Sequence, residues 1–311
     1  MINTILRRVG IFRVPVDVSK YMDSRRMTPF QEHINAISML PNIFLPIAYV
    51  LKGMWMSESL LLHHLSRATG TLTSSAADNC ELFRDSTPKL YECLLRQNGD
   101  SYNPIHVEGC IDNSLFPMLF SYPPLTVLAI AFGIATHAPF SILYHLNAAK
   151  LSPGLEQLEH WSRRLDHIFI HWGWAWISFG VTGNLKYFSM GAVFNAYCIL
   201  QQFKHIVVPK RNQILMVLAM AINVMPMISR GDLQPFILIV SLMVFSSWLF
   251  AAYPLGPWSH AAFHLSMLPI PFIFFSCACM LPSSADHIIR AAQCAAASVP
   301  SLESEEYLNL F

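Results

Sequence analysis

The sequence predicts an all-α membrane protein, a bundle of seven transmembrane helices, and three observations support this fold class. Apolar residues make up 54% of the 311 residues, whereas charged residues make up only 13%. Soluble domains usually contain about a quarter charged residues, so a globular protein surrounded by water is disfavoured. The charged residues are also segregated, because none of them occurs in the windows 34–51, 122–149, 167–185, 187–203, 213–229 and 233–285.

Each window is long enough for one membrane span, and the last is long enough for two. A helix that crosses the membrane needs about 20 mainly apolar residues, and Pro254, Gly256 and Pro257 divide the last window. Lipid cannot satisfy backbone polar groups, so the spans are expected to be helices. The predicted spans are residues 34–53, 122–147, 166–185, 187–207, 212–229, 233–253 and 259–281.

Basic residues predict that the N-terminus lies in the cytosol. The leader, residues 1–33, is polar and basic, which also argues against a cleaved signal peptide, and the loops after the second and fourth spans are basic too. The opposite side receives residues 54–121, which contain eight acidic and four basic residues. We therefore expect a cytosolic leader, a membrane domain at 34–281 with a long exoplasmic loop at 54–121, and an exoplasmic tail at 282–311.

Three short motifs place polar groups at the edges of the apolar windows. His260 and His264 are four residues apart, and such residues share one helix face, so both imidazoles can point at one metal ion. Ser141 and His145 have the same spacing near the end of the second span, and Asp166 begins the third. In the predicted topology all five residues lie on the cytosolic side of the membrane, where a helix bundle can bring them together.

These residue types fit a hydrolytic zinc site. Zinc held by His145, His260 and His264 would keep a fourth position for water, which is typical of catalytic rather than structural sites. Bound metal makes hydroxide available near neutral pH. Asp166 is expected to hold and deprotonate that water, and Ser141 to hydrogen-bond the water or a developing oxyanion. The predicted reaction is hydrolysis of an amide or ester whose tails lie in the bilayer.

A simpler interpretation of the histidines competes with this one. The chain has thirteen histidines, so one pair at this spacing is weak evidence, and His167 and His171 form a second pair. A lone histidine in an apolar helix more often packs or hydrogen-bonds than binds metal. Ionisable groups inside spans are nevertheless functional candidates. We favour hydrogen bonding across helices for His167 and His171, with a rival metal pair as the alternative.

At these residues the chain resembles the progestin and adipoQ receptor (PAQR) and hemolysin III family of seven-span proteins, which is grouped with the alkaline ceramidases. The resemblance lies in Ser141–His145 (SILYH), Arg164–His167 (RLDH) and Ser259–His264 (SHAAFH), with a weaker echo in Gln31–Ser38. It implies a zinc ion held by the three histidines, with the aspartate and serine nearby, in proteins regarded both as receptors and as lipid amidases. The chain departs from the family in its long outer loop and in the longer spacing between SxxxH and the aspartate.

The cysteines follow the predicted topology. Cys80, Cys93, Cys110 and Cys294 fall in the exoplasmic segments, where disulfides form, and we expect at least one bond among them. Four cysteines allow three connectivities, and the sequence does not choose among them. The other three fall in spans and are expected to be small buried thiols: Cys198, Cys277 and Cys279.

Two classes of function fit the sequence. The first is a zinc-dependent intramembrane hydrolase of a ceramide-like amide or another acyl lipid. The second is a seven-span signalling receptor with a structural zinc, sensing a steroid or an adiponectin-like ligand. Either would be a multi-pass protein of the plasma membrane or an endomembrane, with a lipid or lipophilic partner. The chain lacks the phosphate-binding motif GxxxxGK[ST] and a sustained basic patch, so nucleotide and nucleic-acid binding are not expected.

The topology makes a prediction for Glu156, in the basic loop after the second span. A cysteine introduced there should be protected from a membrane-impermeant thiol reagent in intact cells and should react after permeabilisation. Labelling of residue 156 from outside the cell would contradict the cytosolic N-terminus.

Overall fold

A computed structural model describes residues 25–55, 60, 63–64, 110, 121–151, 155–204 and 208–298. These residues are almost entirely helical, and within them the only β pairing is an isolated bridge between Cys110 and Ser121. The α-helices are α3 (Pro29–Ser38), α4 (Pro41–Leu51), α8 (Leu125–Ala148), α9 (Leu155–Glu159), α10 (Trp161–Thr182), α11 (Leu185–Gln202), α12 (Pro209–Arg230), α13 (Leu233–Ala252), α14 (Ser259–Met267), α15 (Ile270–Cys279) and α16 (Ala285–Ser298).

Helices lie over each of the seven predicted spans. Five helical stretches are long and apolar enough to cross a membrane by length and composition. Helices α10 and α11 are not among the five, because buried polar side chains such as His171 and Asn195 interrupt their apolar sequence. The helical fold class and its apolar spans are therefore confirmed, while seven crossings and the orientation of the termini stay predictions. The five stretches are Pro29–Leu51, Leu125–Ala148, Pro209–Arg230, Leu233–Ala252 and Gly256–Cys279.

Local sequence explains where several helices begin and end. Helix α3 starts in a capping box. The Thr28 hydroxyl accepts a hydrogen bond from the backbone N–H of Gln31, and the side-chain oxygen of Gln31 accepts one from the backbone N–H of Thr28. Two backbone donors at the start of the helix are thereby satisfied. Helices α10 and α12 end at Gly183 and Gly231, whose φ values of 62° and 84° lie in the left-handed region. Glycine adopts this conformation without steric cost.

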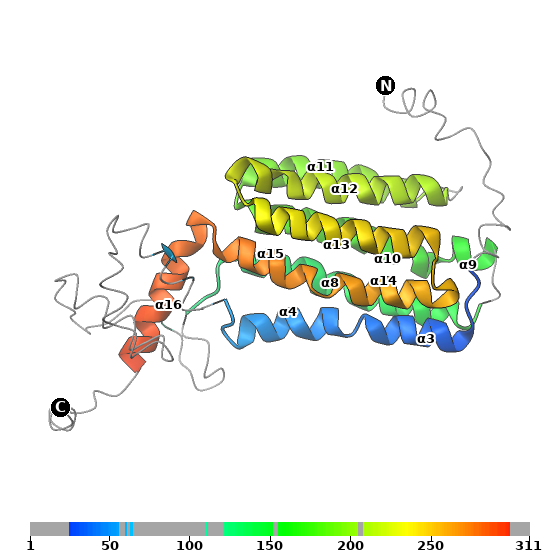
Figure 1. Cartoon of the computed structure of the whole chain (residues 1–311), viewed down its shortest axis with the longest axis horizontal. Coiled ribbons are helices and arrows are strands. Elements are labelled where there is room, and N and C mark those ends of the chain that lie inside the picture. Colours follow the sequence, from blue (N-terminus) through cyan, green and yellow to red (C-terminus); the bar gives the residue numbers. More distant parts are fainter. Residues whose placement is uncertain are drawn as a thin grey trace. The chain divides into compact units, whose positions relative to one another are not determined.

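The chain forms two compact units, residues 1–47 with 128–278 and residues 48–127 with 279–311. In the first, α10 packs against α11 and α12, α13 packs against α14, and α14 packs against α3; the helices run alongside one another as a bundle (Figure 1). At the α9 side of the bundle, α9 lies between α8 and α10 in the chain, and Gly256–Trp258 connects α13 to α14 (Figure 1). This arrangement places the end of α8 and the beginnings of α10 and α14 at the same end of the bundle (Figure 1).

The second unit contains a disulfide between Cys110 and Cys294. The prediction of at least one disulfide among the four outer cysteines is thus confirmed, with α16 as one of the two linked segments. Cys80 and Cys93 lie outside the described residues. The three span cysteines predicted to be buried thiols are buried thiols.

Two glycines bring α8 and α10 into close contact. A Cβ atom built on Gly173 would lie 2.8 Å from the backbone oxygen of Gly133, and one built on Gly133 would lie 2.8 Å from the backbone oxygen of Gly173. Small residues allow this close approach of helices in membranes. Because α8 carries His145 and α10 carries Asp166, the glycine contact also sets the separation of two predicted site residues.

Replacement of Gly173 by alanine should separate these helices. The added methyl group would meet a backbone atom, which cannot rotate away, and such overpacking costs about 1–3 kcal/mol. Gly191→Ala is the matched control, because the nearest atom to its Cβ would be a side-chain atom, the hydroxyl oxygen of Ser178 at 2.9 Å, and not a backbone atom. Thermal unfolding in detergent should show a clearly larger loss for Gly173→Ala, and equal losses would contradict the packing argument.

Candidate metal centre

His145, His260 and His264 lie together in the first unit. One nitrogen from each imidazole can be chosen so that all three atoms lie within 4.8 Å of one another, and among the described residues this is the group suited to hold a metal ion. The ring centroids are 4.9 Å apart for His145 and His260, 5.3 Å for His145 and His264, and 4.7 Å for His260 and His264. The predicted ligand set is therefore brought together by α8 and α14.

The imidazole of His145 is oriented by a carboxylate from α3. Its Nδ1 lies 2.7 Å from Oε2 of Glu32, and both side chains are almost fully buried. The other carboxylate oxygen of Glu32 accepts a hydrogen bond from Nε2 of Gln157, at 3.0 Å. An ionised carboxylate only accepts, so Nδ1 of His145 donates and Nε2 keeps its lone pair for a metal ion.

His264 is oriented by the same helix. Oγ of Ser38 donates to the backbone oxygen of Asn35 at 2.6 Å and lies 2.8 Å from Nδ1 of His264. Since the hydroxyl proton is already used, the ring donates through Nδ1 to Ser38 and, at 3.3 Å, to the Asn35 oxygen. Nε2 of His264 is again left as the acceptor. His260 packs edge-on against Phe250, with ring centroids 5.4 Å apart.

This donor set fits zinc. Zinc–nitrogen bonds of about 2.0–2.1 Å bring tetrahedral ligand nitrogens to about 3.4 Å from one another, so small side-chain rotations would close the group. Metal-bound histidines generally donate their second N–H to a carboxylate or another oxygen, and two of the three do so here. The three histidines thus form a group that could hold a metal ion, and the outer hydrogen bonds of His145 and His264 are already made.

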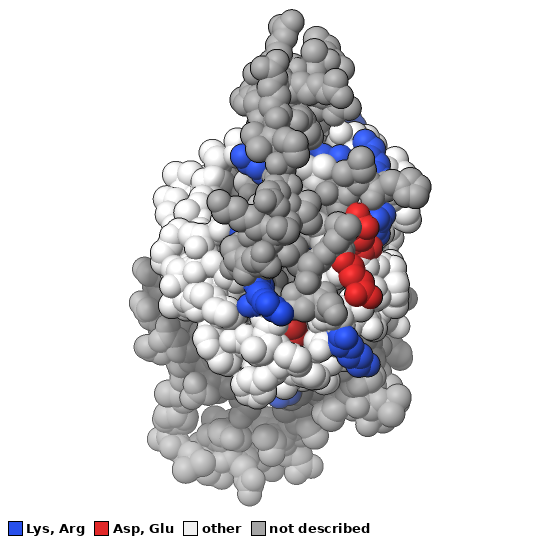
Figure 2. All heavy atoms as spheres, turned by 90° about the vertical axis from the view of Figure 1, so that its right-hand side faces the viewer, with Lys and Arg blue, Asp and Glu red and all other residues white. Residues whose placement is uncertain are grey.

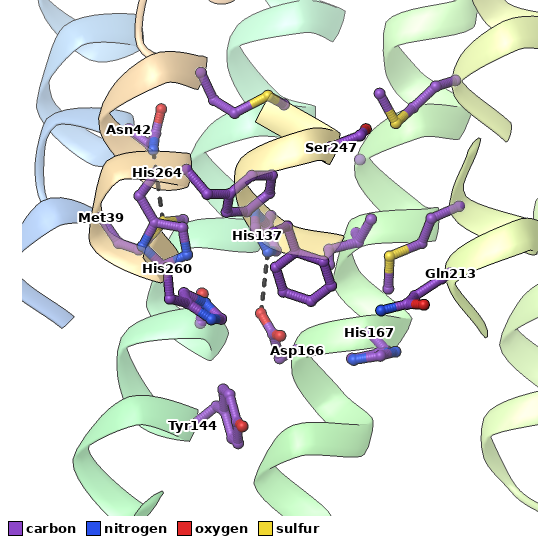
Figure 3. A pocket seen from close by; sticks show the side chains of 18 of the residues that line it. Met39, Asn42, His137, Tyr144, Asp166, His167, Gln213, Ser247, His260 and His264 are labelled. Atoms are coloured by element: carbon purple, nitrogen blue, oxygen red, sulfur yellow. Dashed lines mark hydrogen bonds and ion pairs between the residues drawn. The ribbon is translucent and has the colours of Figure 1, made fainter. Parts of the chain in front are cut away.

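The histidines open into a cavity of about 330 Å³. Ser141 and Asp166 also line it, so all five predicted site residues face one space. Asp166 does not stand alone, because its Oδ1 lies 3.1 Å from Nε2 of His137 (Figure 3). His137 is one turn before Ser141 on α8 and lines the same cavity.

The rival histidine pair on α10 does not form a metal group with a third ligand among the described residues. Nδ1 of His171 lies 3.2 Å from Oδ1 of Asn195 on α11, which is the cross-helix hydrogen bond that the packing interpretation predicts. His167 lines the cavity. The cross-helix hydrogen bond predicted for His171 is confirmed.

Sequence reasoning missed three polar residues of this site. Glu32 and Ser38 lie in Gln31–Ser38, which the sequence analysis treats only as a weaker part of the family resemblance. The available signal was the recurrence of polar residues along this fragment, several of which are buried on α3. The sequence analysis does not include His137 in the site, although its spacing of four and eight residues from Ser141 and His145 places all three on one face of α8. No protein-family model, curated protein or solved structure matches the chain, so its resemblance to the PAQR family stays a prediction.

The contact between Glu32 and His145 predicts that Glu32→Gln weakens metal binding. The change keeps the shape of the side chain but removes the charge that favours the donating tautomer of His145, and loss of such an outer partner typically costs 10–100-fold in metal affinity. Competition with a chromogenic chelator on the purified protein measures this affinity. Glu156→Gln, an exposed change on α9, should have no effect, and an unchanged affinity in Glu32→Gln would contradict the role of the carboxylate.

Proposed function

We propose that this protein is a seven-span, zinc-dependent hydrolase that cleaves a lipid amide or ester within the membrane. The observation that carries the proposal is the group of His145, His260 and His264 at the wall of a cavity that also contains Asp166. Three protein ligands with space beside them are typical of catalytic zinc. The motif resemblance to the PAQR and ceramidase proteins supports the same reading.

Seven crossings are supported by how α10 and α11 bury their polar groups. Asp166, His167 and His171 on α10 and Asn195 on α11 are all buried. Polar side chains inside a membrane face the bundle interior and bond with one another, as His171 and Asn195 do. A helix shielded from lipid by its neighbours therefore tolerates a less apolar sequence than a helix on the outside.

The charge distribution supports a cytosolic location for the metal-site end of the bundle. The face at this end carries Lys and Arg side chains at several places around it and a smaller group of acidic ones (Figure 2). Cytosolic loops carry an excess of Lys and Arg. The described basic residues of these loops are Lys150, Arg163, Arg164, Lys204, Lys210 and Arg211.

Each polar residue of the cavity has its own role in the proposed hydrolysis. Zinc, when bound, would make a water molecule more acidic and polarise the substrate carbonyl. Asp166 takes the proton of the attacking water. Ser141, buried one turn from His145, donates its hydroxyl to the oxygen on which negative charge develops. The imidazoles are kept in their ligating tautomers by Glu32 and Ser38.

The rest of the cavity suits an acyl chain. Beyond the polar groups its wall is formed by apolar side chains from α10, α12, α14 and α15, among them Ile177, Met220, Phe263 and Phe274. Burial of a hydrocarbon chain contributes about 0.8 kcal/mol per CH₂ group, whereas a short polar amide would gain nothing from this wall. The substrate class that fits is an acyl lipid with its amide or ester bond at the histidines.

A receptor remains the second candidate because of the second unit. Its disulfide ties Cys110, within the predicted exoplasmic loop, to Cys294 in the predicted tail. A covalently linked outer element is typical of a folded surface that binds a ligand, and the zinc would then be structural. Metal content together with absence of turnover on lipid amides and esters would favour this candidate.

Two substitutions separate metal binding from proton transfer. His145→Ala should lose stoichiometric zinc, because two remaining imidazoles do not hold the ion tightly. Asp166→Asn should keep the zinc and lose about 100-fold or more of the hydrolytic rate, as expected for loss of a general base. Metal analysis and release of fatty acid from a fluorescent ceramide in detergent micelles measure the two effects.

His33→Ala is the control for the first substitution, because His33 is exposed on α3 and should change neither readout. Full zinc content in His145→Ala would overturn the ligand assignment. Full turnover in Asp166→Asn would overturn the role of the aspartate.

A further inference from the structure

The side chain of His137 is the one group bonded to Asp166 among the described hydrogen bonds and ion pairs. Its Nε2 lies 3.1 Å from Oδ1 of Asp166, and the two side chains are 23% and 11% exposed. Both residues line the cavity (Figure 3). A carboxylate inside a membrane bundle is costly unless a cation or donors compensate it, and this imidazole is positioned to be that partner.

We infer that His137 is the proton donor to the leaving group of the hydrolysis and that Asp166 holds its ring in place for that step. This inference rests on the proposed hydrolase function and assigns it a second titrating residue. Asp166 accepts the Nε2–H, so the proton on Nδ1 is the one available to the cavity. An aspartate that holds a histidine in one orientation and stabilises its charged form is a recurrent catalytic arrangement.

The proton balance of the cycle closes with these two groups. The oxygen of the attacking water bonds to the carbonyl carbon, and its proton passes to Asp166. The bond from the carbonyl carbon to nitrogen breaks as Nδ1 of His137 gives its proton to that nitrogen. The products are a carboxylic acid and an amine, and the pair ends the step with the same number of protons that it began with.

The spacing of the polar residues on α8 fits these proposed roles. His137, Ser141 and His145 follow one another at intervals of four residues and all line the cavity. They share a helix face, so the proposed proton donor, oxyanion partner and metal ligand form one row on the cavity wall. The nitrogen of an amide is a poor leaving group without a proton, whereas the oxygen of an ester leaves more readily, so His137 matters most for amides.

The first test measures protons without turnover. A lipid hydroxamate, which binds zinc as its anion, is titrated into the zinc-loaded protein by calorimetry in buffers of different ionisation enthalpy. In the unaltered protein the hydroxamate proton should stay on Asp166, with about zero protons released. In His137→Gln the partner of the carboxyl is missing, so the pair should no longer take up the hydroxamate proton and about one proton per ligand should appear in the buffer.

Asp166→Asn, which removes the acceptor directly, should also release about one proton, while the exposed change His33→Gln should release none. The other titratable groups lining the cavity are the same in all four proteins, so the difference isolates the pair; they are Arg25, Tyr144, Arg163, His167 and Tyr253 beside the three histidines. An equal proton count in His137→Gln and the unaltered protein would overturn the inference. Failure of the hydroxamate to bind the unaltered protein would overturn the zinc hydrolase and this inference with it.

The second test compares substrates in proteins matched for zinc content. His137→Gln should lose about 100-fold or more in turnover of a lipid amide, and less than about 10-fold for the ester of the same acyl chain, because general acid catalysis contributes about 10²–10⁴-fold where the leaving group needs a proton. Equal losses on both substrates would contradict the role as proton donor. If the unaltered protein cleaves neither substrate but shows the expected proton counts, the hydrolase proposal fails and the role of His137 as leaving-group donor fails with it, while the coupling of His137 to Asp166 is supported.

Discussion

Glu32 on α3 bonds to two other helices through its carboxylate. One oxygen accepts from His145 on α8 and the other from Gln157 on α9. A buried carboxylate that lost one of these partners would be strongly destabilising, so α3 docks in the register that satisfies both oxygens. Ser38, six residues further along the same helix, then reaches His264. One short helix thus orients ligands contributed by two other helices, and the geometry of the metal centre depends on its docking.

Polar groups and helix packing are coupled throughout the first unit. Helices α8 and α10 approach one another through Gly133 and Gly173, and α10 is tied to α12 by a hydrogen bond from Asn223 to the backbone oxygen of Trp174, at 3.2 Å. Such contacts replace the hydrophobic effect, which gives little attraction between helices in lipid. They also keep α10, with Asp166, at a defined distance from the histidines on α8 and α14.

Much of this arrangement could be predicted from the sequence, because the dominant physical signals are local. Charge-free windows identify the helices, since lipid excludes charges and unpaired backbone groups. The ligand histidines were found because a spacing of four residues marks one helix face, and because the predicted topology put His145, His260 and His264 at one membrane depth. The structure brings these three residues together.

The partners of the ligands could not be found in this way. Glu32 contacts His145 across 113 residues of sequence, and Ser38 contacts His264 across 226; neither contact leaves a periodic pattern in the chain. The sequence gives no sign that His137 contacts Asp166, because the two residues lie on different helices, 29 residues apart. The contact between His171 on α10 and Asn195 on α11 has the same origin, because neither helix alone reveals that these two polar side chains meet.

X-ray absorption at the zinc edge of the purified, detergent-solubilised protein tests the central claim most directly. The account predicts about one zinc per chain, with a four-coordinate first shell of three imidazole nitrogens and one further oxygen or nitrogen at about 2.0–2.1 Å. A sulfur neighbour at about 2.3 Å, a shell composed only of oxygen atoms, or a protein that does not retain zinc would contradict it.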